Sequence, residues 1–142
     1  MATILIADDD PVIREIAGEM LRSTDNAALL AEDGLEVLDL LGSLQIDLLI
    51  TDMLMPNMDG VEVIMQARTM QPDLKIIAIS GGGGVGADYI LHTAKMLGAD
   101  AVLKKPLRLD TFLKTIDDLL YEQGRNGSTS LAPGRVASRT GR

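Results

Sequence analysis

Five short apolar runs alternate with amphipathic stretches in this chain, and the alternation allows only a few folds. Strands of about five residues separated by helices of roughly ten or more are typical of βαβ units, whose strands pair in parallel. Because crossovers in such sheets are right-handed, few topologies remain. The sequence therefore predicts an α/β fold, a doubly wound five-stranded parallel sheet with five helices. The expected strands cover residues 3–7, 27–31, 47–51, 75–79 and 100–104.

The stretches between the runs carry helix-start signals and helical periodicity. Asp10 followed by Pro11 is a favoured pairing of N-cap and first turn. The helix that follows should turn one apolar stripe toward the sheet. The residues of this stripe are Val12, Ile13, Ile16, Ala17, Met20 and Leu21. Further helices are expected over residues 34–43, 61–70, 87–97 and 109–122.

Among the remaining topologies, the flavodoxin-like strand order 2-1-3-4-5 places the first and third strands side by side. Ligands bind such sheets outside the carboxyl ends of the strands, at this switch point. Four runs lead into residues suited to metal or phosphate chemistry, namely Asp8-Asp9-Asp10, Asp52, Ser80 and Lys105. The carboxylates of Asp8, Asp9 and Asp52, a hydroxyl and an ammonium should therefore converge on one crevice. Such a set fits a divalent cation together with a phosphoryl group.

Each of these residues taken alone has a simpler interpretation. An acidic pair such as Asp8-Asp9 most often caps the helix that follows it. Asp52 could begin a turn, and the hydroxyl of Ser80 could satisfy its own backbone. An isolated lysine such as Lys105 is usually a surface residue. Their common position at the ends of separate strands favours the joint functional interpretation, because structural context raises the weight of a motif.

Five motifs in register over residues 3–122 resemble the receiver domain of bacterial two-component response regulators, in particular a single-domain, chemotaxis-regulator-like receiver. The motifs are Ile4–Asp10 followed by Arg14, Asp52 with Met55–Gly60, Ser80-Gly81, Gly98–Asp100, and Lys105-Pro106. The resemblance implies a phosphoacceptor that receives a phosphoryl group from a histidine kinase or a phosphotransfer protein. It implies switched protein–protein contacts, and no enzymatic activity beyond self-phosphorylation and autodephosphorylation.

The resemblance also assigns a role to the residues that would contact the phosphoryl group. Asp52 would be the phosphorylated nucleophile, which agrees with an ordinary aspartate being ionised at neutral pH. Lys105 would pair with one phosphoryl oxygen, and Ser80 would donate a hydrogen bond to another. In the family, the peptide bond between Lys105 and Pro106 is typically cis, a geometry that proline makes accessible.

The same resemblance implies a cofactor, Mg²⁺ or Mn²⁺. Asp9 and Asp52 would supply carboxylate ligands, and Leu54 would supply its backbone carbonyl. Asp8 would complete the acidic pocket. Magnesium prefers oxygen ligands in near-octahedral geometry and keeps several waters, which suits such a set.

The chain departs from the family pattern in two respects. Val102 stands where receivers often carry an aromatic residue that reads out activation, so the sequence leaves undecided how a movement of Ser80 would reach the surface formed by the last two helices and the last strand. Leu54 and Gly82, two residues past Asp52 and Ser80, have no polar side chain to orient an attacking water. Because hydrolysis of a phosphoryl group is accelerated mainly by positioning the attacking water, we expect a comparatively long-lived acyl phosphate.

Charge divides the chain into an acidic body and a basic end. The net charge is −8, but residues 1–124 hold all 21 acidic residues, and the four arginines beyond them have no acidic neighbour. We expect residues 1–122 to be the receiver domain and residues 123–142 to be a disordered basic tail. An acidic body argues against nucleic-acid binding by the folded domain, because phosphate backbones attract cationic surfaces.

Composition sets the remaining expectations. The 142 residues suffice for one domain with its own core, and the absence of cysteine excludes disulfides and thiolate metal sites. No stretch approaches about 18 consecutive apolar residues, and a strand pattern begins at the N-terminus, so we expect no membrane association and a cytoplasmic location. We expect the protein to be a monomer or a weak, phosphorylation-dependent dimer.

Other classes of protein remain alternatives. A metal-dependent phosphohydrolase would need a second carboxylate where Leu54 stands, and a flavin-binding module would not place three aspartates in its phosphate loop. A degenerate receiver acting as a scaffold would not need the full acid set and Lys105. A fragment of a hybrid kinase or of a larger regulator is compatible with the sequence.

Overall fold

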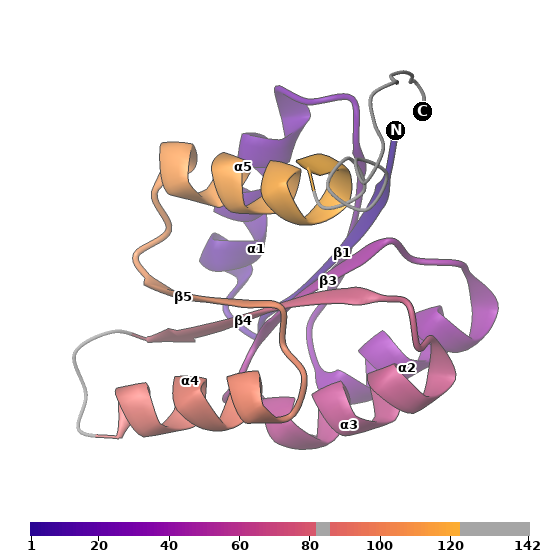
Figure 1. The fold of residues 1–142 in the computed structure, drawn as a ribbon, viewed down its shortest axis with the longest axis vertical. Coiled ribbons are helices and arrows are strands. Elements are labelled where there is room, and N and C mark those ends of the chain that lie inside the picture. Colours follow the sequence, from indigo (N-terminus) through magenta and orange to yellow (C-terminus); the bar gives the residue numbers. More distant parts are fainter. Residues whose placement is uncertain (82–85, 123–142) are drawn as a thin grey trace, which may run out of the picture.

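A five-stranded, entirely parallel sheet in the order β2-β1-β3-β4-β5 forms the centre of the molecule (Figure 1). The computed structural model describes residues 1–81 and 86–122. The strands are β1 (Thr3–Ala7), β2 (Ala27–Ala31), β3 (Leu48–Asp52), β4 (Lys75–Gly81) and β5 (Ala101–Lys105). The predicted fold class and strand order are confirmed.

Helices cover both faces of this sheet (Figure 1). The α-helices are α1 (Pro11–Arg22), α2 (Gly34–Ser43), α3 (Gly60–Met70), α4 (Ala87–Met96) and α5 (Leu109–Asp117). Helices α1 and α5 lie on one face, and α2, α3 and α4 lie on the other. The five predicted helices are present, but the last one is α-helical only to Asp117, and residues Asp118–Glu122 form a π-helical turn, η1.

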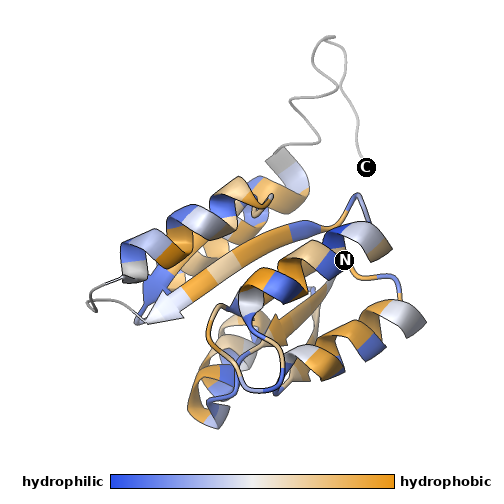
Figure 2. Ribbon diagram, turned by 90° about the horizontal axis from the view of Figure 1, so that it is seen from below, coloured by the Kyte–Doolittle hydropathy of each residue, from blue (hydrophilic) through white to orange (hydrophobic). Residues whose placement is uncertain are grey.

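The sheet separates two hydrophobic cores, because successive strand residues point to opposite faces. In β3 all five residues are buried, and Leu48 and Ile50 pack with α1 and α5 while Leu49 packs with α2, α3 and α4. Phe112 of α5 is the largest of the fully buried side chains and fills the α1–α5 side. The strands are accordingly mostly apolar along their length (Figure 2).

Helix α1 begins as predicted but buries less than predicted. The side chain of Asp10 accepts a hydrogen bond from the backbone N–H of Val12, so the N-cap is confirmed. Ala17 and Leu21 are buried, but Val12 is 58% exposed and Ile16 is 40% exposed. The predicted apolar stripe is therefore wrong at these two positions, because the stripe is wider than the part of α1 that contacts the sheet and α5.

Three of the predicted site residues belong to the strands rather than to the loops that follow. Asp52, Ser80 and Lys105 lie within β3, β4 and β5, which extend one or two residues further than the apolar pattern indicates. Backbone pairing continues to the edge of the sheet, as the register pairs Gly81 with Lys105. These three side chains therefore start from backbone that the sheet holds in place.

Some predictions fall outside the described residues. The disordered tail predicted for residues 123–142 and the role of Gly82 belong to this group. Within residues 1–81 and 86–122, no helix has the length and apolarity required to cross a bilayer.

Candidate functional site

Three carboxylates meet at the carboxyl edge of the sheet. Because β1 and β3 pair in parallel with Ala7 opposite Thr51, the next residues along each strand, Asp8 and Asp52, come side by side. Asp8, Asp9 and Asp52 each offer an oxygen within 4.8 Å of the others. Asp8 and Asp52 are buried, whereas Asp9 is exposed. The cluster therefore opens to solvent on the Asp9 side.

Lys105 joins this cluster from the far edge of the sheet. Its Nζ lies 2.8 Å from Oδ2 of Asp8 and 3.5 Å from Oδ2 of Asp52. The lysine side chain is 21% exposed and the two carboxylates are almost fully buried. One ammonium thus bridges Asp8, just after β1, and Asp52 of β3, and it leaves the group of four side chains with a formal net charge of −2.

The environment shifts the titration of Asp52 and Lys105 in the same direction for different reasons. Burial, and then the neighbouring charge of Asp8, raise the pKa of Asp52, although Lys105 and nearby backbone N–H groups oppose this. Burial alone would lower the pKa of Lys105, but its contacts with Asp8 and Asp52 outweigh burial and raise it. The ammonium therefore stays charged, and the carboxylates lack a full set of compensating charges.

Asp8 shows most clearly that another cation would fit here. Its Oδ1 accepts a hydrogen bond from the backbone N–H of Asp10 at 2.9 Å, and its backbone carbonyl accepts one from Nη1 of Arg14 at 2.7 Å. Its Oδ2 is buried and accepts no hydrogen bond within the described residues, so the ion pair with Lys105 is its main compensation. An all-oxygen donor set with excess negative charge suits a hard divalent cation.

Ser80 lies near the carboxyl end of β4, at the same edge of the sheet as Asp52. The residue is 2% exposed, and its hydroxyl makes one long contact, 3.5 Å, with the backbone carbonyl of Gly81. This distance is at the limit of a hydrogen bond. The hydroxyl therefore makes no strong hydrogen bond within the described residues.

The loop after β3 places Leu54 beside the cluster. Leu54 is 61% exposed, so its side chain contributes little to the core. Gly60 closes the loop with a hydrogen bond from its N–H to the carbonyl of Met53 at 2.9 Å. A Cβ at residue 60 would lie 2.6 Å from Cα of Met53 and 2.9 Å from the carbonyl oxygen of Asp52, so only glycine fits without displacement.

A second connection of this loop was not predicted from the sequence. Asn57 has a positive φ of 71°, and its side-chain N–H donates to Oδ2 of Asp33, the N-cap of α2, at 2.9 Å. Asparagine is one of the few residues other than glycine that tolerate this conformation. The Pro-Asn-Met-Asp-Gly turn signal marks the loop, but nothing in the sequence identifies Asp33 as its partner.

The predicted cis peptide bond between Lys105 and Pro106 is present. The structure thus brings together Asp8, Asp9, Asp52 and Lys105, with Ser80 on the adjoining strand of the same edge. Whether these side chains have the predicted roles, and whether the carbonyl of Leu54 binds a cation, stays a prediction.

Comparison with known proteins identifies the family. The model of the response regulator receiver domain matches residues 4–117. The chain belongs to the response regulator receiver family. Response regulator MprA of Mycobacterium avium is 36% identical over 117 residues, which are 82% of this chain and 50% of MprA. Transcriptional regulatory protein GlrR of Escherichia coli is 32% identical over 121 residues, 85% of this chain and 27% of GlrR.

Solved receiver structures agree with the fold. A CheY-like response regulator receiver domain protein from Methanospirillum hungatei superimposes with a TM-score of 0.78 at 28% identity, covering 89% of this chain and 99% of that one. Chemotaxis response regulator CheY4 of Vibrio cholerae gives a TM-score of 0.75 at 28% identity, covering 84% of this chain and 99% of that one. The receiver resembles whole chains of these structures but spans half or less of the curated relatives.

Proposed function

We propose that this receiver domain accepts a phosphoryl group on Asp52 from the phosphohistidine of a histidine kinase or a phosphotransfer protein. The observation that carries the proposal is Lys105 Nζ lying between Asp8 and Asp52, at 2.8 Å and 3.5 Å, in a cluster that keeps excess negative charge. Such a site supplies both a carboxylate that can act as the nucleophile and an ammonium that can pair with a phosphoryl oxygen.

In the proposed transfer, an oxygen of the Asp52 carboxylate attacks the phosphorus atom in line with the leaving group. The phosphorus–nitrogen bond to the donor imidazole breaks, and the imidazole leaves with the electron pair and takes up a proton. The product is an acyl phosphate on Asp52. Hydrolysis of this product restores the carboxylate, so the chain carries out no chemistry except on itself.

Mg²⁺ or Mn²⁺ fits the acidic cluster, since Asp8, Asp9 and Asp52 offer oxygens within 4.8 Å of one another and Lys105 alone pairs with them among the described residues. Asp9, Asp52 and the carbonyl of Leu54 would hold the ion, and Asp8 would support it. When bound, the cation offsets the repulsion between the carboxylates and the phosphoryl oxygens. Lys105 would move from the carboxylate of Asp52 to a phosphoryl oxygen, and Ser80 would donate to another.

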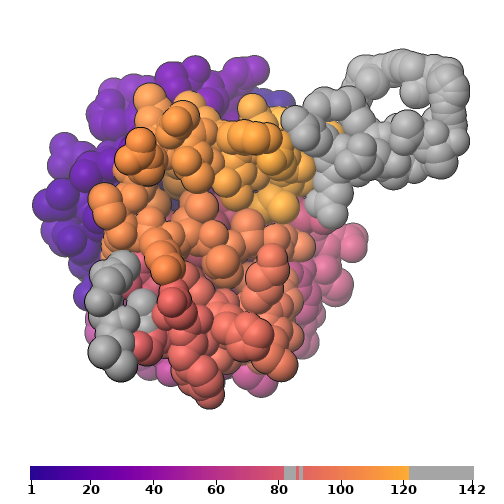
Figure 3. Space-filling view, turned by 60° about the vertical axis from the view of Figure 1, so that its left-hand side comes forward, coloured from indigo at the N-terminus to yellow at the C-terminus, as the bar shows by residue number. Residues whose placement is uncertain are grey.

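The output is proposed to be a change in protein–protein contacts on the α4–β5–α5 face, where the three elements form one continuous surface (Figure 3). Val102 of β5 is half-buried and packs against the core under α2, α3 and α4, in register with Ala78 of β4. A movement of Ser80 would reach this face through β4 and β5 without an aromatic rotamer. A cytoplasmic location and a monomer, or a weak dimer on phosphorylation, complete the proposal.

The experiment is incubation with acetyl phosphate and Mg²⁺ followed by intact-mass measurement. We expect a gain of one phosphate that is stable in acid, labile to hydroxylamine and absent from Asp52→Asn. Asp39→Asn on the exposed surface of α2 makes the same chemical change away from the crevice and should keep the mass gain. No mass gain in the unaltered chain would reject the proposal in favour of a degenerate receiver that acts as a scaffold.

A further inference from the structure

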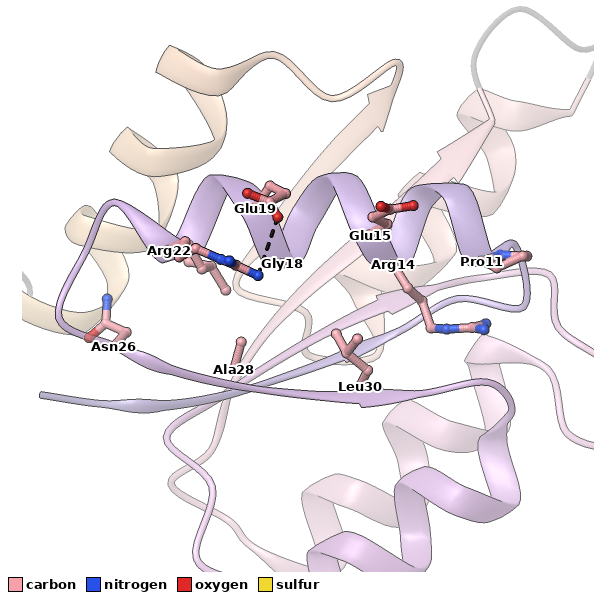
Figure 4. Close-up of a pocket in the computed structure, with 10 residues that line it drawn as sticks. Pro11, Arg14, Glu15, Gly18, Glu19, Arg22, Asn26, Ala28 and Leu30 are labelled. Carbon is pink, nitrogen blue, oxygen red and sulfur yellow. Dashed lines mark ion pairs between the residues drawn. The ribbon is translucent and has the colours of Figure 1, made fainter.

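A groove separate from the acidic cluster runs between α1 and the edge strand β2 (Figure 4). Its volume is about 550 Å³. From β2, Ala28 and Leu30 point toward α1, while Asn26 lies at one end of the groove and Pro11 lies at the other. Leu30 is 44% exposed although its side chain is entirely apolar.

The groove exists because α1 has no side chain at its centre. Gly18 lines the groove, and a Cβ at this position would meet nothing within 4 Å. Glycine inside a helix is unfavourable relative to alanine, and no close approach of another atom requires it here. The small residues Gly18 and Ala28 together therefore leave open an apolar surface that ordinary side chains would fill.

Strand β2 also has an unused edge. It is the outer strand of the sheet and pairs with β1 alone among the described residues. Its sequence, Ala-Ala-Leu-Leu-Ala, has no charge and no proline, which are the usual protections of an edge strand. An extended segment can add to such an edge through backbone hydrogen bonds and place alternate side chains in an adjoining groove.

The chain itself returns to one end of this groove. Tyr121 in η1 donates a hydrogen bond from its hydroxyl to Oδ1 of Asn26 at 2.8 Å, and the same oxygen accepts one from the N–H of Ala2 at 3.0 Å. Asn26 is a lining residue of the groove. The described part of the chain therefore ends beside the groove, and residues 123–142 are covalently tethered there, which gives them a high effective concentration for it.

Charge at this end of the molecule favours a cationic segment. Burial, together with the negative charges of Asp117, Asp25 and Asp47, raises the pKa of Tyr121. Along the groove, Glu15 forms no ion pair within the described residues.

The two cations of the groove are already engaged. Arg22 pairs with Glu19 at 3.2 Å, and Arg14 donates to the carbonyl of Asp8 at 2.7 Å. Residues 123–142 contain four arginines, no acidic residue, and the apolar residues Leu131 and Val136. Their composition therefore complements both the acidic end of the groove and its apolar floor.

We propose that residues 123–142 of the same chain bind in the α1–β2 groove, with apolar side chains over Leu30 and Ala28 and arginines toward Glu15 and the acidic residues near Tyr121. The twelve residues of α1 give the groove a length of roughly 18 Å. Twenty residues can extend to about 66 Å, so the segment is long enough to follow the groove over its whole length.

The test is paramagnetic relaxation in the full chain, which has no native cysteine and therefore accepts one spin label cleanly. With a label on Ser138→Cys, we expect the amide signals of Ala28 and Leu30 to lose more than half of their intensity. The signal of Met65, on the opposite face of the sheet, should keep its intensity. Gly18→Ala, which leaves the groove open, should preserve the effect, and Gly18→Leu, which fills it, should reduce the effect several-fold.

A second variant keeps the test valid if Gly18→Leu fails to fold. Glu15→Gln removes one groove charge from an exposed position and should weaken the effect, as should raising the salt concentration from 0.05 to 0.5 M. Equal loss of signal at Ala28, Leu30 and Met65, or no loss at any of them, would overturn the proposal. So would an effect seen only when spin-labelled protein is mixed with unlabelled ¹⁵N protein, because the groove would then bind a second copy.

Discussion

The side-chain amide of Asn57 donates a hydrogen bond to Oδ2 of Asp33 at 2.9 Å and so ties the loop after β3 to the start of α2. The other oxygen of Asp33 caps α2 by accepting from the backbone N–H of Glu36, also at 2.9 Å. One carboxylate thus holds a helix end and the loop that carries Leu54. The bond with Glu36, followed by that with Asn57, lowers the pKa of Asp33.

Two substitutions of Asn57 should separate the contribution of its hydrogen bond to stability from that of its backbone conformation. Asn57→Ala removes the bond and places alanine at a φ of 71°, whereas Asn57→Gly removes only the bond. We expect Asn57→Ala to lower the free energy of unfolding by about 1–3 kcal/mol, and Asn57→Gly to lower it less. Urea denaturation measures both, and equal losses would show that the positive φ causes no strain.

The buried carboxylate of Asp52 should destabilise the fold at neutral pH. Its pKa is raised in the folded protein, mainly by burial, so the folded state gains stability as pH falls and Asp52 becomes protonated there before it does so in the unfolded chain. Asp52→Asn should raise the melting temperature at pH 7 by a few degrees, as a change of about 1 kcal/mol would do.

The pH dependence provides the control for Asp52. The gain from Asp52→Asn should shrink as pH is lowered through the folded-state pKa, because the unaltered aspartate is then neutral as well. Asp39→Asn should show no such dependence. A gain that is the same at pH 4 and pH 7 would contradict a raised pKa for Asp52.

Lys105 should compete with a divalent cation for the same carboxylates. Lys105→Gln removes the ammonium 2.8 Å from Asp8, which leaves the acidic cluster with one more unit of uncompensated charge. We expect tighter Mg²⁺ binding by roughly tenfold, equivalent to about 1.4 kcal/mol, together with slower phosphorylation. Titration calorimetry measures the first and acetyl phosphate labelling the second.

Lys104→Gln is the matched control, because Lys104 pairs with Asp88 at 2.6 Å on the exposed surface. Its Mg²⁺ affinity should equal that of the unaltered chain. If Lys105→Gln bound Mg²⁺ no more tightly than Lys104→Gln, the ammonium and the cation would not share the cluster.

Gly60 should be required for the geometry of the loop. Gly60→Ala forces a Cβ into contact with the backbone of Met53 and Asp52, so the strand end carrying Asp52 must shift. We expect a loss of about 1–3 kcal/mol in the free energy of unfolding and a large loss of phosphorylation. Gly42→Ala, whose Cβ would meet only the end of Met70 at 3.7 Å, should be neutral or slightly stabilising.

The parts of the site that lie at strand ends were predictable, and the tertiary contacts were not. Asp8 and Asp52 follow apolar runs, and parallel pairing alone brings them together, so periodicity and strand order suffice. The hydrogen bonds of Asn57 with Asp33 and of Tyr121 with Asn26 join residues 24 and 95 positions apart. Such contacts depend on how loops and helix ends pack, which no local pattern encodes.

Burial was predictable only where both faces of an element are covered. The central strand β3 is buried throughout, as its apolar run indicates. At the edge of the sheet, Leu30 of β2 and Val12 of α1 have the same apolar character but remain exposed, because no further strand or helix lies beside them among the described residues. Hydrophobic periodicity identifies the faces that could be buried, and neighbouring elements determine which ones are.

The acyl phosphate should be long-lived because the residue two positions after Asp52 offers no polar group to water. Leu54 is 61% exposed, so a polar side chain there would lie in solvent beside the crevice and cost little stability. Leu54→Gln should accelerate loss of phosphate several-fold by orienting an attacking water. Intact-mass measurements after removal of acetyl phosphate follow the decay. Leu54→Met, an apolar control, should decay at the original rate, and loss of the phosphate within seconds from the unaltered chain would contradict the idea.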